Sequence, residues 1–124
     1  MPIAIGIDLV GYDEIAEALR RGDRYLRRIY TDEELDDCGA SPRLLAACFA
    51  AKEATMKALS RTDQPIPWRS IELRMRHGAQ PSLELTGAAA SLALARGVSG
   101  LSVSVTHSSQ SAAAIVLAST GGMS

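Results

Sequence analysis

The sequence predicts an α+β protein in which a largely antiparallel sheet packs against a long helix. Three observations predict this class. Short β-branched or alternating segments occur at both ends of the chain and in its middle, a nearly all-apolar helical segment spans 41–60, and turns containing glycine or proline separate the segments. The predicted order of elements is β-α-α-α-β-β-α-β-β.

The first half of the chain is predicted to be one strand followed by helical segments. IAIGIDLV (3–10) is apolar and β-branched, as strands are. DEIAEALRRG (13–22) has helical spacing and ends in glycine, a common helix stop, and DRYLRRIY (23–30) is a second short helical piece. TDEEL (31–35) starts with threonine followed by acids, as helix N-termini do. SPRLLAACFAAKEATMKALS (41–60) opens with Ser-Pro, a strong helix start.

The second half is predicted to contain two pairs of strands and one helix. RSIELRMR (69–76) alternates, which places Ile71, Leu73 and Met75 on one face of a strand. The other predicted elements are a loop over 61–68, a turn over 77–81, a short strand over 82–86, an Ala-rich helix over 87–97 that glycine closes, and a hairpin of strands 101–108 and 111–119.

Composition narrows the class of protein further. The chain has 124 residues, 47% of them hydrophobic and 22% charged, which is typical of a globular protein. This length predicts a single domain over residues 1–124. The net charge of −1 provides no basic field, so a nucleic-acid partner is not expected.

The ends and the cysteines predict a cytoplasmic protein. MPIAIGIDLV has no basic region and carries Asp8 within its apolar run, unlike a signal peptide. No stretch reaches the ~18 uninterrupted apolar residues of a membrane span, so no membrane association is expected. Cys38 and Cys48 form no CxxC motif and no zinc spacing, which fits a reducing compartment.

Three charges within CFAAKEATMKAL (48–59) are the first candidates for chemistry. A helix that is apolar on all sides is normally buried, and burying Lys52, Glu53 or Lys57 without a partner would cost several kcal/mol each. The simpler alternative is an exposed i,i+4 pair of Glu53 and Lys57, which is worth roughly 0.2–0.5 kcal/mol.

Asp8 is a second unusual charge, because it lies in the middle of the predicted first strand. It shares a face with Ala4, Gly6 and Val10, and Gly6 leaves room for a ligand or another backbone to approach. The alternative is a cap for the following helix, although Asp13 competes for that role. Two carboxylates from separate elements with lysines nearby suit Mg²⁺ and a phosphate.

His107 ends the predicted strand 101–108, and a strand end that enters a turn is a place from which a histidine can reach a site. The alternative is an exposed edge histidine. The flanking hydroxyls of Ser104, Thr106, Ser108 and Ser109 either bind phosphate or are solvated strand positions.

Taken together, these motifs resemble the holo-acyl-carrier-protein synthase family of 4′-phosphopantetheinyl transferases. GIDLV resembles the first strand of the family, and FAAKEATMKAL (49–59) is close to its hallmark helix. RRIYTDEEL (27–35) resembles the turn that precedes its acidic helix. VSVTHS (103–108) and AAAIVLA (112–118) resemble its last two strands, so the resemblance covers nearly the whole chain.

The resemblance implies transfer of the phosphopantetheine arm of coenzyme A to a serine hydroxyl of an apo acyl or peptidyl carrier protein. Adenosine 3′,5′-bisphosphate would be released and Mg²⁺ would be required, and the family serves pathways such as fatty-acid and polyketide biosynthesis. A homotrimer with active sites between subunits is also implied. Asp8 and Glu53 match the metal ligands, and Glu53, Lys57 and His107 match the catalytic residues.

The same resemblance implies a set of substrate-binding residues, with two departures from the family pattern. Cys48 stands where the family has an arginine that helps to bind phosphates, so Arg43 or Lys52 would substitute. The turn Gly78-Ala79-Gln80-Pro81 lacks the lysine of the family's turn beside the adenine. The implied substrate-binding residues are Arg43, Lys52, Gly78, Pro81, Ser104 and Ser108.

Docking of the carrier protein is the last expectation. Arg21, Arg24 and Arg28 fall where the family places basic residues that face an acidic carrier, whereas Glu14 replaces an arginine on the preceding helix. The alternative is a solvated charged face balanced by the acids of 32–37. The alternative function is a catalytically silent trimer of the same fold that binds coenzyme A or a partner.

Overall fold

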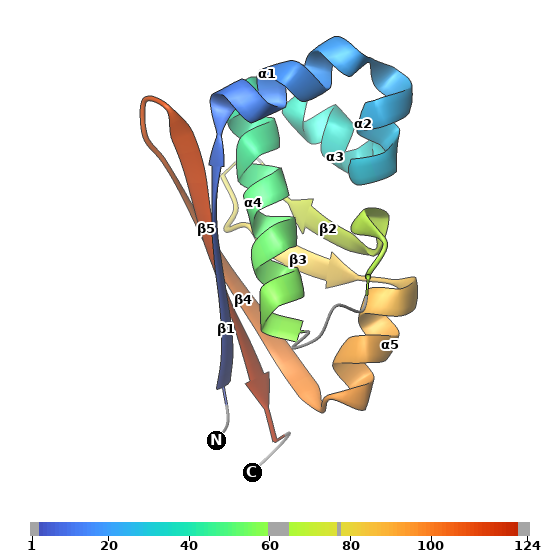
Figure 1. Ribbon diagram of the computed structural model, residues 1–124. Helices are drawn as coiled ribbons and strands as arrows, with labels where there is room; N and C mark the ends of the chain where they lie inside the picture. The colour runs from blue at the N-terminus through green and yellow to red at the C-terminus, as the bar shows by residue number, and fades with distance from the viewer. Residues whose placement is uncertain (1–2, 60–64, 77, 122–124) are drawn as a thin grey trace.

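A computed structural model describes residues 3–59, 65–76 and 78–121. Its strands and helices are arranged in an α+β fold (Figure 1). In chain order they are β1 (Ile3–Gly11), α1 (Tyr12–Arg21), α2 (Asp23–Ile29), α3 (Asp32–Cys38), α4 (Pro42–Leu59), the short 3₁₀ helix η1 (Trp68–Ser70), β2 (Ile71–Arg74), β3 (Ser82–Leu85), α5 (Gly87–Ala95), β4 (Val98–His107) and β5 (Ser111–Thr120).

The predicted class is confirmed, but the predicted order lacks one helix. Among the described residues, four α-helices lie between β1 and β2, one for each of the four helical segments predicted there, whereas the predicted order gave three. Gly22 divides them with φ of 93°, a left-handed conformation that glycine adopts readily, and its amide donates to the carbonyl of Leu19 at 3.2 Å. The expected caps of the next two helices are present: Thr31 forms a capping box with Glu34, and the Ser41 hydroxyl accepts from the Leu44 amide.

Both sheets are antiparallel. The larger sheet has the order β1-β5-β4, so β5 is central and β1 and β4 are its edges, while β2 and β3 form a second sheet. Asp8 pairs with Ala114 of β5, and Ala114 pairs in turn with Val105 of β4. His107 lies one inward-facing position further along β4, opposite Ala112. Asp8 and His107 therefore belong to opposite edges of one sheet.

Helix α4 lies along the inner face of the larger sheet and forms the centre of the core (Figure 1). Its contact surface is made largely of alanines, which allow a close approach. A Cβ atom added to Gly6 of β1 would lie 1.8 Å from the carbonyl oxygen of Ala54. The sequence predicted that either a ligand or another backbone approaches Gly6, and the structure shows the backbone of α4 there. This approach brings the second half of α4 against Asp8.

The outer face of the same sheet exposes a row of large apolar side chains. Ile3, Ile5, Ile7 and Leu9 of β1 are between 59% and 68% exposed, and Ile115 and Leu117 lie beside them on β5. Such a contiguous apolar surface on a small protein indicates an interaction site. Within the described ranges, no helix has the length and apolarity needed to cross a membrane.

Candidate active site

Asp8 and Lys57 meet at the edge of the sheet where α4 crosses β1. The Lys57 ammonium donates to Asp8 Oδ1 at 2.9 Å and to the carbonyl of Ile7 at 3.1 Å. The Asp8 side chain is 15% exposed, while that of Lys57 is 54% exposed. The hydrogen bond to Asp8 raises the pKa of Lys57, so this lysine remains a cation. The pair joins a shielded carboxylate to a cation that a ligand can reach.

Glu53 lies one turn before Lys57 on the same helix and is partly buried. Burial raises its pKa, and the negative charges of Asp8 and Glu14 raise it further, whereas Lys57 opposes them. The negative charges of Asp8 and Glu14 therefore both act on the Glu53 carboxylate. A bound cation would oppose this effect and favour the ionised form of Glu53.

The carboxylates of Asp8 and Glu53 suit a metal site that is completed by substrate and water, and not one made of protein ligands alone. Among the described residues, no group of three or more His, Cys, Asp and Glu side chains is placed to hold a metal ion. A cage built from protein ligands alone is therefore not formed by these side chains. Asp8 and Glu53 instead offer two carboxylates, which is the set with which Mg²⁺ binds when substrate phosphates and water complete its shell.

Lys52 does not line this site, which corrects the expectation that it binds phosphate. Its side chain is 0% exposed, and its ammonium pairs with Glu34 Oε1 at 2.8 Å. It also donates to the backbone carbonyls of Trp68, at 2.9 Å, and of Ile71. Because these three acceptors use all three ammonium donors, Lys52 is a buried structural cation and a phosphate cannot reach it.

The imidazole of His107 lies at the opposite edge of the sheet, beside the first turn of α4. Burial and the nearby Arg43 guanidinium lower its pKa, so it is neutral at pH 7. Its Nε2 atom is buried and has no hydrogen-bond partner among the described residues. Arg43 itself is exposed. His107 and Arg43 thus form a second group, separated from Asp8 by the width of β5.

The other expected substrate-binding residues are distributed over several surfaces. Ser104 is exposed and faces the outer side of the sheet, opposite to His107. The Ser108 hydroxyl accepts from the backbone amides of the β4–β5 turn. Gly78 and Pro81 lie in the segment that joins β2 to β3, and β3 contacts β4. One chain by itself does not gather these residues around Asp8.

Cys48, which stands where the family has an arginine, lies in the core and not on the surface. Cys48 is completely buried within α4, and burial and the adjacent Cys38 thiol raise its pKa. Both cysteines are free thiols. This position therefore offers no cation to a phosphate, and with Lys52 excluded, Arg43 is the remaining candidate for that role.

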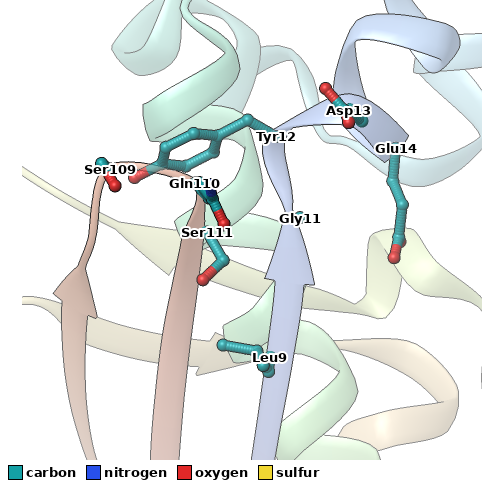
Figure 2. Close-up of a pocket in the computed structure, with 8 residues that line it drawn as sticks. All are labelled: Leu9, Gly11, Tyr12, Asp13, Glu14, Ser109, Gln110 and Ser111. Atoms are coloured by element: carbon teal, nitrogen blue, oxygen red, sulfur yellow. The ribbon is translucent and has the colours of Figure 1, made fainter.

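A pocket of about 700 Å³ opens where β1 runs into α1, next to the β4–β5 turn (Figure 2). Figure 2 shows the Tyr12 ring reaching across to the turn, while Glu14 lies on the other side of β1 in this view. The Tyr12 hydroxyl donates to the carbonyl of Ser108 at 2.9 Å. The pocket is lined by Leu9, Gly11, Tyr12, Asp13, Glu14, Ser109, Gln110 and Ser111.

The arginines expected to dock a carrier protein all lie on the surface of α1 and α2. Arg21, Arg24 and Arg28 are exposed, and the Arg21 guanidinium stacks 4.9 Å from the centre of the Tyr25 ring. Glu14 lies at the start of α1 and is also exposed. Part of the alternative, a balanced charged face, is also present, because Arg27 pairs with Asp32 at 2.7 Å.

Two residues that matter here were missed in the sequence. Glu34 was visible as part of an acidic helix start, but nothing near it indicated Lys52, which is 18 residues away, as its partner. No pattern in the sequence indicated a role for Tyr12, because its contact with Ser108 joins residues that are 96 positions apart.

Comparison with known proteins gives one consistent family. The model of the 4′-phosphopantetheinyl transferase superfamily matches residues 4–116. A holo-[acyl-carrier-protein] synthase of Desulforudis audaxviator is 38% identical over 122 residues, which cover 95% of this chain and 93% of the relative.

Solved structures agree with this result. The ACPS–CoA complex of Chronobacterium ammoniagenes superposes with a TM-score of 0.85 at 26% identity, covering 98% of this chain and 99% of the other. The holo-[acyl-carrier-protein] synthase of Helicobacter pylori in complex with coenzyme A has a TM-score of 0.81 at 26% identity, covering 93% and 99%.

Proposed function

The chain belongs to the holo-acyl-carrier-protein synthase family of 4′-phosphopantetheinyl transferases, and on this premise we propose that it transfers the 4′-phosphopantetheine arm of coenzyme A to a serine of an apo carrier protein. The serine oxygen forms a bond to the phosphorus attached to pantetheine. The bond from that phosphorus to the other half of the pyrophosphate breaks, and adenosine 3′,5′-bisphosphate leaves. The whole chain acts as one domain.

The observation that carries the proposal is the cluster of Asp8, Glu53 and Lys57. Phosphoryl transfer needs mainly positioned groups and neutralised charge. Lys57 remains charged and accessible, so it is suited to bind the pyrophosphate or to protonate the leaving phosphate. Glu53, directly or through a water molecule, takes the serine proton.

Mg²⁺ is the proposed cofactor, with Asp8 and Glu53 as its protein ligands. When bound, it would neutralise phosphate charge during the transfer. Burial raises the pKa of Glu53 most, and the negative charges of Asp8 and Glu14, which raise it further, support a cation at this position. Because Lys57 already contacts Asp8 at 2.9 Å, the lysine restrains that carboxylate.

The active form that we propose is a homotrimer with sites between subunits. The apolar row of Ile3, Ile5, Ile7 and Leu9 supports it, because an isolated chain would expose this row to water. The position of His107 supports it too. A head-to-tail ring joins the β1 edge of one chain to the β4 edge of the next, and it would place His107 of the partner subunit beside Asp8. Light scattering after size exclusion should report three chains, and a stable, active monomer would contradict the arrangement.

In the same arrangement, Arg43 would contribute a cation for the phosphates of coenzyme A near His107. The Ser104 and Ser108 hydroxyls and the turn of Gly78 and Pro81 would complete the substrate surface. We place the enzyme in the reducing cytoplasm, which is supported by the free thiols of Cys38 and Cys48.

The acceptor is proposed to be a carrier protein that is less acidic than usual, or whose charges are rearranged. Arg21, Arg24 and Arg28 would bind an acidic carrier, whereas the exposed Glu14 beside the cleft would repel it. Glu14→Arg should speed modification of a standard acidic fatty-acid carrier and steepen its salt dependence. Arg24→Glu should slow every acceptor without changing coenzyme A binding. Unchanged rates for Glu14→Arg on all carriers would show that Glu14 does not face the acceptor.

Mass spectrometry of apo carrier proteins tests the proposed reaction. A panel of fatty-acid, polyketide and peptide carriers is incubated with coenzyme A, Mg²⁺ and the protein, and each modified carrier gains the mass of phosphopantetheine. Glu53→Gln, which keeps the shape and removes the charge, should nearly abolish the gain while leaving the fold intact, as should Asp8→Ala. Binding of coenzyme A without any gain across the panel would favour the silent trimer instead.

A further inference from the structure

Tyr12 ties the beginning of α1 to the turn that follows His107. Its backbone amide donates to the carbonyl of Gln110 at 2.9 Å, and its hydroxyl donates to the carbonyl of Ser108 at 2.9 Å. These two contacts hold the turn from two directions, and Figure 2 shows the ring lying against it. The contact joins segments that are almost a whole chain length apart in sequence.

The turn itself is braced internally, so that it moves as one unit. The Ser108 amide donates to the Ser111 carbonyl at 2.8 Å, and the Ser108 hydroxyl accepts from the amides of Ser111, at 3.1 Å, and of Gln110, at 3.2 Å. Because its internal geometry is set in this way, the position of the turn relative to the helices depends on what contacts it from outside. Tyr12 makes such contacts.

His107 directly precedes this turn and lies on an edge strand. Among the strands of the described residues, β4 has a sheet neighbour on one side only, which is β5. A displacement of the Ser108 carbonyl would therefore be transmitted to His107 through one peptide unit. On its inner side the imidazole faces Arg43 of α4. The imidazole is thus held between the first turn of α4 and the turn that Tyr12 anchors.

We propose that Tyr12 is a positioning residue for His107, and that it couples the start of the carrier-docking helix α1 to the histidine of the proposed active site. The hydroxyl acts by holding the Ser108 carbonyl. This inference rests on the proposed function, since it assigns to His107 a role in the transfer.

A double-mutant cycle tests the inference. Transfer to an apo carrier protein is measured for the intact chain, Tyr12→Phe, His107→Ala and the double variant, with kcat and KM for coenzyme A obtained for each. Tyr12→Phe removes one hydrogen bond and keeps the ring, so a loss of roughly tenfold in kcat/KM is expected. In the His107→Ala background the same change should have no effect, because the group that it positions is gone.

Ser119→Ala is the matched control. The Ser119 hydroxyl also donates to a backbone carbonyl of the same hairpin, that of Gly100 at 3.4 Å, but at the end far from His107. Its removal should leave the transfer rate unchanged, and thermal unfolding should show that both hydroxyl deletions leave the fold intact.

The remaining outcomes overturn the inference in distinguishable ways. Equal losses for Tyr12→Phe in both backgrounds would mean that Tyr12 acts independently of His107, and no loss in either would mean that it has no role in transfer. A fully active His107→Ala variant would remove the histidine from the mechanism, and the role of Tyr12 with it, while the transferase activity itself would stand. An intact chain that modifies no carrier would refute the proposed function instead.

Discussion

Helix α4 forms two lysine ion pairs in opposite environments. Lys52 and Glu34 are both 0% exposed, and every polar atom of the lysine head group has a partner inside the protein. Five residues further along, Lys57 is 54% exposed and pairs with Asp8, whose side chain is 15% exposed. The two lysines lie about 140° apart around the helix axis, because each residue advances the helix by about 100°.

The difference shows that burial determines whether a charged side chain stabilises the fold or remains available to a ligand. A buried pair is costly to disrupt, because removal of one partner leaves an uncompensated charge in the core. An exposed pair contributes little to stability, because water screens it and competes for each partner. Lys52 therefore joins α4 to α3 and β2, while Lys57 remains available to a ligand. Four predictions test this division, beginning with the largest effect on stability.

The largest effect is expected for breaking the buried pair. Lys52→Met or Glu34→Gln should lower the free energy of unfolding by about 3–5 kcal/mol, because each leaves a buried charge without its opposite charge. Urea denaturation followed by circular dichroism measures this loss. Glu34→Leu combined with Lys52→Met should recover much of it, since no charge then remains in the core. A single variant as stable as the intact chain would show that the pair is not buried in solution.

A smaller loss is expected for Gly6→Ala, which would separate the helix from the strand that carries Asp8. The added Cβ atom would lie 1.8 Å from the Ala54 carbonyl oxygen, so the backbone of α4 must move. Overpacking of this kind costs about 1–3 kcal/mol. Transfer activity should fall as well, because Glu53 and Lys57 move with the helix. Gly11→Ala is the control on the same strand, since its Cβ atom would meet nothing within 4 Å.

Removal of the exposed pair should change stability little and activity strongly. Lys57→Met should alter the free energy of unfolding by less than about 1 kcal/mol. Transfer should nevertheless fall at least roughly a hundredfold, because the cation proposed to meet the pyrophosphate is lost. Denaturation and the carrier-protein assay are run on the same preparation. A loss of stability comparable to that of Lys52→Met, or a normal rate, would contradict the division.

The smallest effect concerns the charge at the N-terminal end of α4. Burial, and to a smaller extent Arg43, lowers the pKa of His107 from 6.5. The unfolded chain therefore binds a proton on this imidazole more tightly than the folded chain does. As the pH falls below 6.5, protonation of His107 thus lowers the stability of the fold. Arg43→Met should raise the pKa of His107, while burial keeps it below 6.5. Titration of the imidazole by NMR measures the shift, and a pKa that stays constant or falls would show that Arg43 does not act on His107.

Much of this fold and part of the site were predictable from local pattern. Alternation placed Ile71 and Leu73 on the buried face of β2, and both are buried. Asp8 attracted notice because an acid interrupts an apolar strand, and Glu53 and Lys57 because charges interrupt an apolar helix. The distinction between Lys52 and Lys57 was not predictable, because both are lysines in the same alanine-rich segment and the sequence does not state which helix face meets which neighbour.

The sequence by itself determined the periodicities, the start of α4 at Pro42 and the residue types able to bind a metal and a phosphate. Only the tertiary structure decided which of those charges face the core, because that depends on partners far along the chain. Glu34 reaches Lys52 from α3, Gly6 admits the backbone of Ala54, and Tyr12 meets the turn after His107. Each contact joins elements whose separation in sequence carries no periodic signal, and it is set by how the helices and strands pack against one another.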